Sequence, residues 1–313
     1  MLQPSRAFRL LAVTTAAGAW TLVAVGGVVR ITESGLGCPD WPLCEGRVVP
    51  QGSKEAAIEF SHRATAAAVT TLVLLVAVWA LWRYRSRFEL VVPAVVAAAF
   101  IPGQALLGAI VVWLDLPGWI VGVHFVVGML FLAATVATAV AAWRPRAAGA
   151  WSGRTVRLAW ISAGFGLLLV GAGAAVVSAH ADEACGKEWP SCNGAFVAGG
   201  SDATVQVIHR TLAYALALLV FALAIAAWRG GGPRLVASLP LLAVLVQMGF
   251  GISLVLAGEK SAAHDDLAGL HVAGAGVVWA LLVALALRAS RPLQAPLLHL
   301  SLQAPPLPQK GMP

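Results

Sequence analysis

The chain has 313 residues, of which 59% are hydrophobic and only 11% are charged. A soluble domain of this length needs far less apolar surface for its core, so the composition excludes a soluble protein and indicates a protein of the lipid bilayer. The formal net charge of +7 does not indicate a nucleic acid partner, because the short loops between apolar runs cannot form a basic groove or an aromatic platform.

Apolar runs of about 20 residues, long enough to span the hydrocarbon layer, recur along the chain. They predict an all-α integral membrane protein with eight transmembrane helices. The predicted spans cover residues 8–29, 60–82, 89–113, 119–142, 157–179, 205–228, 234–257 and 266–288. The first span follows two arginines, as a signal peptide would. Its Leu11-Ala12 recurs as Leu158-Ala159 in the fifth span, which cannot be a leader, so we expect the first span to be permanent.

Cationic side chains predict the orientation of these spans. Arginines precede the first span and follow each even-numbered span. The positive-inside rule therefore places those loops and both termini in the cytoplasm. The loops on the opposite side hold most of the acidic residues, namely Glu33, Asp40, Glu45, Asp182, Glu183, Glu188, Glu259, Asp265 and Asp266.

The loops after the first and fifth spans contain all four cysteines, Cys38 and Cys44 in one and Cys185 and Cys192 in the other. The predicted topology puts them on the outer, oxidising side, where disulfides persist. Their spacing allows each pair to close a small ring. A disulfide that staples the loop is the plain interpretation, and a redox-active pair is the alternative. A zinc site is disfavoured because no Cys-x-x-Cys pair is present.

The second span opens with Glu59-Phe60-Ser61-His62-Arg63, and the sixth opens 147 residues later with Gln206-Val207-Ile208-His209-Arg210. His124 and His271 are also 147 residues apart. The chain therefore reads as a doubled unit of four helices, and an even number of helices gives both copies the same orientation. We expect two tandem four-helix bundles, residues 1–147 and 148–291, followed by a short disordered tail, residues 292–313.

The four repeated histidines carry the clearest chemistry, because an ionisable side chain inside a membrane helix is costly without a partner. All four fall in one layer near the outer ends of their spans. Two histidines at equal depth can face each other across a four-helix bundle, and two imidazoles on opposite faces of a tetrapyrrole make a six-coordinate iron. Packing or hydrogen bonding is the ordinary alternative for a single histidine. His180, His264 and His299 lack the repetition and are predicted to be surface residues.

Glu59 breaks the symmetry between the halves. It lies one turn before His62, where the second half has Gln206. A carboxylate can accept a proton and an amide cannot, so any chemistry confined to one half belongs to the first. An i,i+4 ion pair with Arg63 is the structural alternative. Arg63 and Arg210 are either snorkelling anchors or partners for porphyrin propionates.

Two glutamines and several glycines complete the pattern. Gln104 and Gln247 lie within apolar spans, where they are expected to hydrogen-bond between helices. Glycines such as Gly26-Gly27 and Gly171-Ala172-Gly173 allow close approach of helices. The same glycines also leave room for a bulky planar ligand.

The run from Val29 to Cys44, the segment from Glu59 to Arg63, the stretch from Gln104 to Gly108 and His124 together resemble the haem A synthase family. The resemblance extends over residues 8–288. It implies oxidation of a ring methyl group of haem O to the formyl group of haem A, which is inserted into terminal oxidases.

The resemblance also implies site roles. His209 and His271 would hold a haem b cofactor, His62 and His124 would hold the substrate haem by its iron, and Glu59 would be the catalytic carboxylate. If two histidines occupy the substrate iron, we expect stepwise removal of electrons and protons from the methyl group, with water as the oxygen source and haem b as electron relay.

The family further implies that Cys38 and Cys44 are the outer-loop pair of the catalytic half, and the chain departs from the simplest family pattern in having the second pair. Haem O synthase and oxidase assembly factors are the implied partners, besides the lipid bilayer, and the implied location is the bacterial cell membrane. No nucleic acid partner is expected, and the sequence leaves a homo-oligomer open.

Two other classes of function remain at this point. A di-haem carrier that exchanges electrons with quinone would also need four histidines, although it would not need Glu59. A disulfide-generating membrane oxidoreductase would need the outer cysteine pairs but would leave the histidines unexplained.

Overall fold

The computed structural model describes residues 3–144, 151–195, 199–230, 232–258, 261 and 263–290. These residues form eight long helices and one short 3-10 helix, with no β-strand among them. The elements are α1 (Arg6–Ile31), η1 (Ser34–Leu36), α2 (Lys54–Arg83), α3 (Phe88–Trp113), α4 (Gly118–Trp143), α5 (Gly153–Ser178), α6 (Ser201–Arg229), α7 (Arg234–Ala257) and α8 (His264–Ala289). Each long helix has the length and hydropathy to cross a membrane, which confirms the predicted all-α membrane fold.

The helices that carry the Glu59 and Gln206 segments begin earlier than the sequence predicted. Helix α2 starts at Lys54, and the side chain of Ser53 caps it by accepting a hydrogen bond from the Ala56 N–H (3.1 Å). Helix α6 starts at Ser201. The first turns of both helices are polar, so hydropathy alone does not detect them. As a result, His62 lies more than two turns inside its helix.

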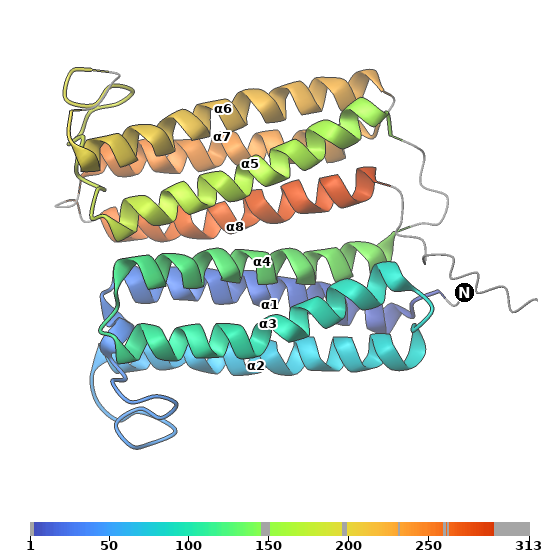
Figure 1. Ribbon diagram of the computed structural model, residues 1–313, viewed down its shortest axis with the longest axis horizontal. Helices are drawn as coiled ribbons and strands as arrows, with labels where there is room; N and C mark the ends of the chain where they lie inside the picture. Colours follow the sequence, from blue (N-terminus) through green and yellow to red (C-terminus); the bar gives the residue numbers. More distant parts are fainter. Residues whose placement is uncertain are drawn as a thin grey trace, which may run out of the picture.

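The helices gather into two groups of four (Figure 1). Helices α1–α4 form one group and α5–α8 the other, with α8 packed against α1 and α4, and α4 also packed against α5. One continuous cluster of buried apolar residues crosses the boundary, for example Val69, Met129, Leu132, Leu216 and Leu282. Residues of both groups therefore share this cluster, and a second cluster, around Phe8 and Leu90, lies within the first group.

Tryptophans and an arginine tie the two groups together through backbone carbonyls. Trp20 of α1 donates its indole N–H to the carbonyl of Ala273 in α8 (2.9 Å), and Trp279 of α8 donates to Met129 in α4 (2.7 Å). Arg144 donates to the carbonyl of Leu287 (3.0 Å). A buried indole N–H needs such a partner, so these contacts fix how α8 sits against the first group.

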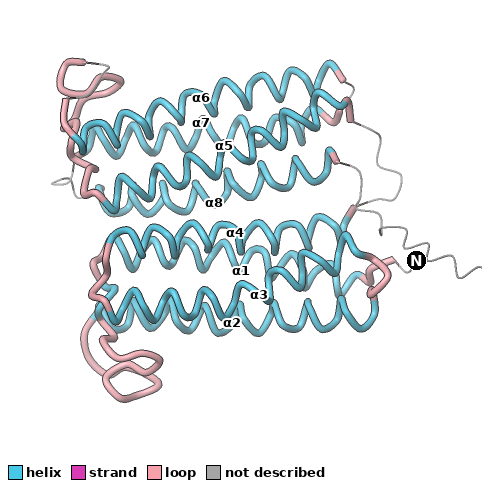
Figure 2. The backbone as a smooth tube through the Cα atoms, viewed as in Figure 1, coloured by secondary structure: helices cyan, strands magenta, loops and turns pink. Residues whose placement is uncertain are grey.

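The molecule has two chemically different ends. The loops that connect α1 with α2 and α5 with α6 both project from one end, at the left of Figure 2, and the N-terminus lies at the other. Arg83 and Arg229 end α2 and α6 at the end opposite these loops. The two cysteine loops and the first turns of α2 and α6 therefore lie at the same end of the bundle.

The predicted tail, residues 292–313, and His299 within it lie outside the described residues.

Candidate functional site

The loop between α1 and α2 is closed by a disulfide between Cys38 and Cys44, whose Cα atoms lie 4.5 Å apart. Both cysteines are fully buried against Ala56 of α2. Cys44 and Arg47 exchange backbone hydrogen bonds of 2.8 and 3.0 Å, which close a tight turn. The loop is thus a compact cap and not a free connection.

Asp40 stabilises this turn from within. Its carboxylate accepts the N–H groups of Glu45 (2.5 Å) and Gly46 (2.7 Å). Gly46 has a φ of +71°, in the left-handed region that favours glycine. The hydrogen bond from Gly46 is the main reason that the pKa of Asp40 lies below its ordinary value.

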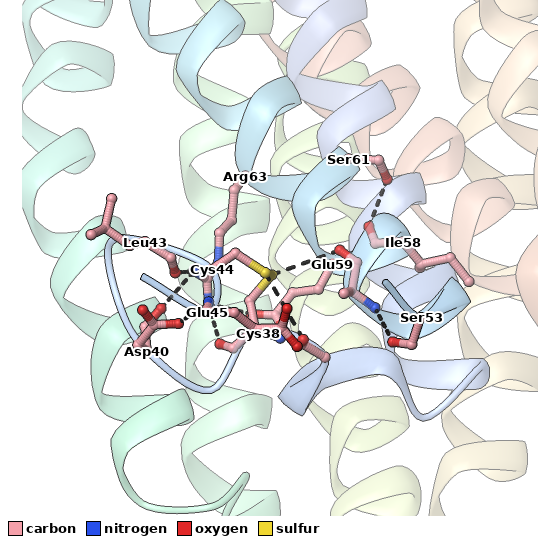
Figure 3. Close-up of a disulfide and its surroundings, with 12 residues drawn as sticks. Cys38, Asp40, Leu43, Cys44, Glu45, Ser53, Ile58, Glu59, Ser61 and Arg63 are labelled. Carbon is pink, nitrogen blue, oxygen red and sulfur yellow. Dashed lines mark hydrogen bonds and ion pairs between the residues drawn. A yellow bond between two sulfur atoms is a disulfide. The ribbon is translucent and has the colours of Figure 1, made fainter. Parts of the chain in front are cut away.

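Two side chains of α2 attach the loop to the helix (Figure 3). Glu59 is only 4% exposed, and its Oε2 accepts the N–H of Cys38 at 2.7 Å. Its other oxygen, Oε1, pairs with Nη2 of Arg63 at 2.5 Å. The predicted i,i+4 ion pair is therefore present, and the same carboxylate also holds the backbone of the disulfide loop.

Arg63 directs its guanidinium at the loop backbone. Nη2 donates to the carbonyl of Cys38 (2.8 Å), and Nη1 donates to the carbonyls of Asp40 (3.0 Å) and Leu43 (2.5 Å). Together with Glu59, these contacts leave neither terminal nitrogen of Arg63 without a partner. Glu59, Arg63 and the disulfide form one connected network, which we call the Glu59 network.

The loop between α5 and α6 has the same framework. Cys185 and Cys192 form the second disulfide, with Cα atoms 4.6 Å apart, so both predicted pairs are confirmed. Cys192 exchanges backbone hydrogen bonds with Ala195, as Cys44 does with Arg47. Glu188 accepts the N–H of Gly194 (2.7 Å), in the role that Asp40 has in the first loop.

The anchoring of this second loop differs where glutamine replaces glutamate. Gln206 is buried, and its Nε2 donates to the carbonyl of Asp182 (2.8 Å). Arg210 donates from Nη1 to the carbonyls of Glu188 (3.0 Å) and Ser191 (2.8 Å). Its Nη2 is buried and has no partner among the described residues.

Each of the four repeated histidines lies against a glycine on the helix that precedes it in the chain. A β-carbon at Gly26 would lie 3.0 Å from Cε1 of His62, and one at Gly173 would lie 3.1 Å from Cε1 of His209. The corresponding distances are 3.6 Å for Gly108 to His124 and 3.0 Å for Gly251 to His271. At Gly26, Gly173 and Gly251 the absence of a side chain makes room for the imidazole ring, whereas a β-carbon at Gly108 would make ordinary van der Waals contact. We call the four positions the seat glycines.

The histidines of the second half face each other. The ring centroids of His209 and His271 are 6.4 Å apart, with an angle of 75° between the ring planes. Two imidazoles that bind one metal ion from opposite sides, with metal–nitrogen bonds of about 2 Å, have centroids about 6 Å apart. The separation of the centroids is therefore close to that of two imidazoles on one metal ion.

The remaining ligands of such an ion would not come from the protein. Within the part of the chain that the structure describes, no three His, Cys, Asp or Glu side chains gather as a metal site. A tetrapyrrole supplies four equatorial nitrogens and leaves the two axial positions to imidazoles. The pair His209 and His271, with its seat glycines, thus fits an iron tetrapyrrole better than zinc.

The two membrane glutamines bind the helices that carry His124 and His271. Gln104 of α3 donates to the carbonyl of His124 (3.2 Å). Gln247 of α7 donates to the carbonyl of His271 (2.7 Å) and contacts its Nδ1 (3.1 Å). The predicted hydrogen bonds between helices are confirmed. They fix α4 against α3 and α8 against α7 at the level of the histidines.

Sequence reasoning did not single out Tyr214 or the individual roles of the seat glycines. Tyr214 lies one turn after Arg210, where the first half has Ala67, and its hydroxyl is buried without a partner among the described residues. Aligning the two halves position by position would have revealed this second asymmetry. The roles of the seat glycines are visible only once the helices are packed, because a β-carbon at many other glycines would have no atom within 4 Å.

Comparison with known proteins identifies one matching family model and several relatives that share one name. The family model described as COX15-CtaA, cytochrome oxidase assembly protein, matches residues 9–57 and 51–284. A protein of Shouchella clausii named Heme A synthase is 32% identical over 80% of this chain and 87% of its own length. A Heme A synthase of Halalkalibacterium halodurans is 32% identical over 82% and 89%, and one of Exiguobacterium sibiricum is 31% identical over 66% and 71%.

Proposed function

The chain belongs to the COX15-CtaA family of cytochrome oxidase assembly proteins, and from this membership we infer that it acts as a haem A synthase of a cell membrane. It is an oxidoreductase that converts haem O into haem A for the assembly of terminal oxidases. The observation that carries this conclusion is the match to Heme A synthases over most of both chains. It favours haem oxidation over the electron carrier and the disulfide-generating enzyme.

We assign the two haem sites to the two halves. His62 and His124 hold the iron of the substrate, haem O, in the half formed by residues 1–147. His209 and His271 hold a haem b in the half formed by residues 148–291. The separation of the rings of His209 and His271 supports the second assignment. When bound, haem b supplies reversible one-electron transfer next to the substrate half.

Glu59 acts as the proton acceptor in the first half. Its carboxylate is buried three residues before His62 and contacts the guanidinium of Arg63 and the N–H of Cys38. Oxidation of a methyl to a formyl group releases protons together with electrons, so a base close to the haem-binding layer is required. Gln206 stands at the matching position of the second half and cannot accept a proton, which confines the chemistry to one half.

The disulfide of the first loop keeps the N–H of Cys38 in place for Glu59. Because Cys38 both forms the disulfide and donates to the carboxylate, the loop positions the base. The second disulfide holds a loop that has no carboxylate to position. We therefore give the Cys38–Cys44 pair a role close to the reaction and the Cys185–Cys192 pair a structural one.

The orientation follows from charge. Both cysteine loops and the histidine layer lie towards the outer side of the membrane, and both termini lie in the cytoplasm, as the arginine distribution predicts. The partners are the enzyme that supplies haem O and the factors that receive haem A, both of which handle a hydrophobic tetrapyrrole in the same membrane.

Haem extraction and chromatography from membranes of cells supplied with haem O test this assignment. The parent protein should form haem A, His62→Ala should form none while keeping haem b, and His209→Ala should lose haem b. Ala67→Gly, a change on α2 away from the proposed ligands, is the control. Absence of haem A from the parent, with haem O and an electron acceptor confirmed in the membranes, would refute the function.

A further inference from the structure

Arg210 presents an unusual electrostatic situation. The residue is only 8% exposed, and one of its terminal nitrogens, Nη2, is buried without a partner among the described residues. Its other terminal nitrogen donates to two backbone carbonyls of the second cysteine loop. Among the described residues, no carboxylate lies within ion-pair distance of this guanidinium. A buried guanidinium without an ion-pair partner is costly, because the group has lost water without gaining a close counter-charge.

The first half shows what is missing. There, Nη2 of Arg63 binds the carboxylate of Glu59. At the matching place in the second half, Gln206 is neutral and turns its amide towards the carbonyl of Asp182. The replacement of glutamate by glutamine thus removes the carboxylate partner and leaves the arginine in place, with hydrogen bonds to two loop carbonyls where Arg63 has three.

A second unpartnered donor lies on the same face of α6. Tyr214 follows Arg210 at i+4, so both side chains emerge from one side of the helix. Its ring contacts Trp189 edge-to-face, with ring centroids 6.4 Å apart, and Trp189 adjoins Glu188, whose carbonyl binds Arg210. The Tyr214 hydroxyl is buried and unpartnered. Both residues therefore lie beneath the same loop, each with a free hydrogen-bond donor.

We propose that Arg210 and Tyr214 form a carboxylate-binding subsite that receives a propionate of the tetrapyrrole held by His209 and His271. The subsite rests on the proposed function for the presence of haem in this half. Arg210 immediately follows the ligand His209 in α6, so the guanidinium and the imidazole belong to the same turn. A ligand carboxylate supplies the anion that Gln206 does not, and charge-assisted hydrogen bonds to it are among the stronger ones in proteins.

The subsite distinguishes a resident haem from one that must leave. In the second half, the carboxylate of the ligand pairs with the guanidinium of Arg210, so haem is held both by its iron and by the propionate at its edge. In the first half, Glu59 already neutralises Arg63, and the residue matching Tyr214 is Ala67. A substrate haem there is held by its iron without this edge contact, which suits a site that must release product.

The test compares two ligands in full-length protein purified in detergent: iron protoporphyrin IX and its dimethyl ester, which lacks free carboxylates. Transfer of each ligand to an excess of a haem-scavenging protein is followed by the loss of the bis-imidazole absorption. We expect the parent to retain the free acid about tenfold or more longer than the ester, as fits a hydrogen bond to a charged group.

Two variants that keep Arg210 sharpen the test. Gln206→Glu supplies an internal anion to Arg210, and Tyr214→Phe removes only a hydroxyl. Both should shorten retention of the free acid and leave that of the ester unchanged. The matched control, Ala67→Ser in the first half, should change neither. Unaltered mobility in size-exclusion chromatography and unaltered helical circular dichroism show that the variants are folded.

The outcomes separate the subsite from the function on which it rests. Equal retention of acid and ester by the parent, or no effect of Gln206→Glu, would overturn the subsite while leaving haem binding by His209 intact. If the parent binds no haem, or if His209→Ala retains as much haem as the parent, the haem b assignment is overturned, and the subsite with it.

Discussion

The loops of the two halves are each fixed to their helix by an arginine that binds loop carbonyls, and the halves differ at the residue one turn before that arginine. In the first half, Glu59 joins Arg63 to the N–H of Cys38. In the second, Gln206 donates to the carbonyl of Asp182, and Arg210 has a buried nitrogen without a partner among the described residues. The scaffold is thus common to both halves, and exchange of a single carboxylate for an amide decides which half has an ion pair at this place and which has an arginine with an unpartnered nitrogen.

Removing the carboxylate in the first half is the most direct way to break this comparison. Glu59→Gln should lower haem A formation by about 10²- to 10⁴-fold, the range for loss of a general base, while haem remains bound. The measurement is the haem A to haem O ratio in extracts of membranes with equal protein content.

The matched control for this change is Gln206→Ala, which alters the corresponding residue of the other half. It should leave haem A formation within a few-fold of the parent. A loss of activity as large as that of Glu59→Gln would contradict the assignment of catalysis to one half.

Removing the arginines should affect the two loops unequally. Arg63→Ala leaves a buried carboxylate without its counter-charge and should cost about 3 kcal/mol, the lower end for a buried pair because the Arg63 side chain is 18% exposed. Arg210→Ala should cost less, because Gln206 is neutral and the arginine itself is incompletely paired. Urea unfolding in detergent, followed by protease cleavage within the two loops, measures both.

A greater loss of stability from Arg210→Ala than from Arg63→Ala would mean that Glu59 is uncharged in the folded protein. The Glu59→Gln, Arg63→Ala double variant identifies the source of the cost. Its stability should exceed that of Arg63→Ala alone, because the unpaired carboxylate is gone.

The matched seat glycines Gly26 and Gly173 should be needed equally in the two halves. In Gly173→Ala, the new β-carbon 3.1 Å from Cε1 of His209 must displace the imidazole, and an overpacked site of this kind costs about 1–3 kcal/mol. We expect roughly tenfold weaker haem binding, read from the haem absorbance per mole of purified protein. Gly26→Ala should act in the same way on substrate haem at His62.

Gly171→Ala is the control on the same helix, because nothing lies within 4 Å of a β-carbon there. Its haem content should equal that of the parent. If Gly171→Ala and Gly173→Ala lose haem alike, the cause is a general effect on α5 and not the contact with the imidazole.

The smallest expected effect concerns the pH dependence of the first loop. Folding lowers the pKa of Asp40 below its ordinary value of 3.8, so the folded loop favours the carboxylate form. This contribution is present above the unfolded pKa and is lost as the pH falls through the folded pKa. The protection factor of the Gly46 amide, which is its exchange rate corrected for the intrinsic effect of pH, should therefore fall below about pH 4.

Asp40→Asn should exchange faster than the parent at neutral pH and should lose this acid-dependent change. Because Asp40 is exposed to solvent, the difference should be modest. An acid-dependent change of the same size in Asp40→Asn would show that another group titrates.

Much of the fold was predictable because long apolar runs identify membrane helices. The 147-residue offset between His62 and His209 indicated that the segments around the two histidines are equivalent. The starts of α2 and α6 were missed because serine and charged residues in their first turns do not register as apolar. The spacing of the cysteines gave both disulfide pairs. The partners of Arg63 and Arg210 were not predictable, since they are backbone carbonyls, which carry no signature in the sequence.

The seat glycines also bear on the order in which the protein is built. Each lies on the helix that precedes its histidine in the chain: Gly26 with His62, Gly108 with His124, Gly173 with His209 and Gly251 with His271. Every imidazole seat is therefore complete within one helical hairpin, as soon as that hairpin leaves the translocon. The opposing imidazole of each pair comes from the next hairpin, so a nascent chain gains a complete pair only when four helices have been inserted. The proposed substrate site is therefore complete before the four helices of the second half have been inserted.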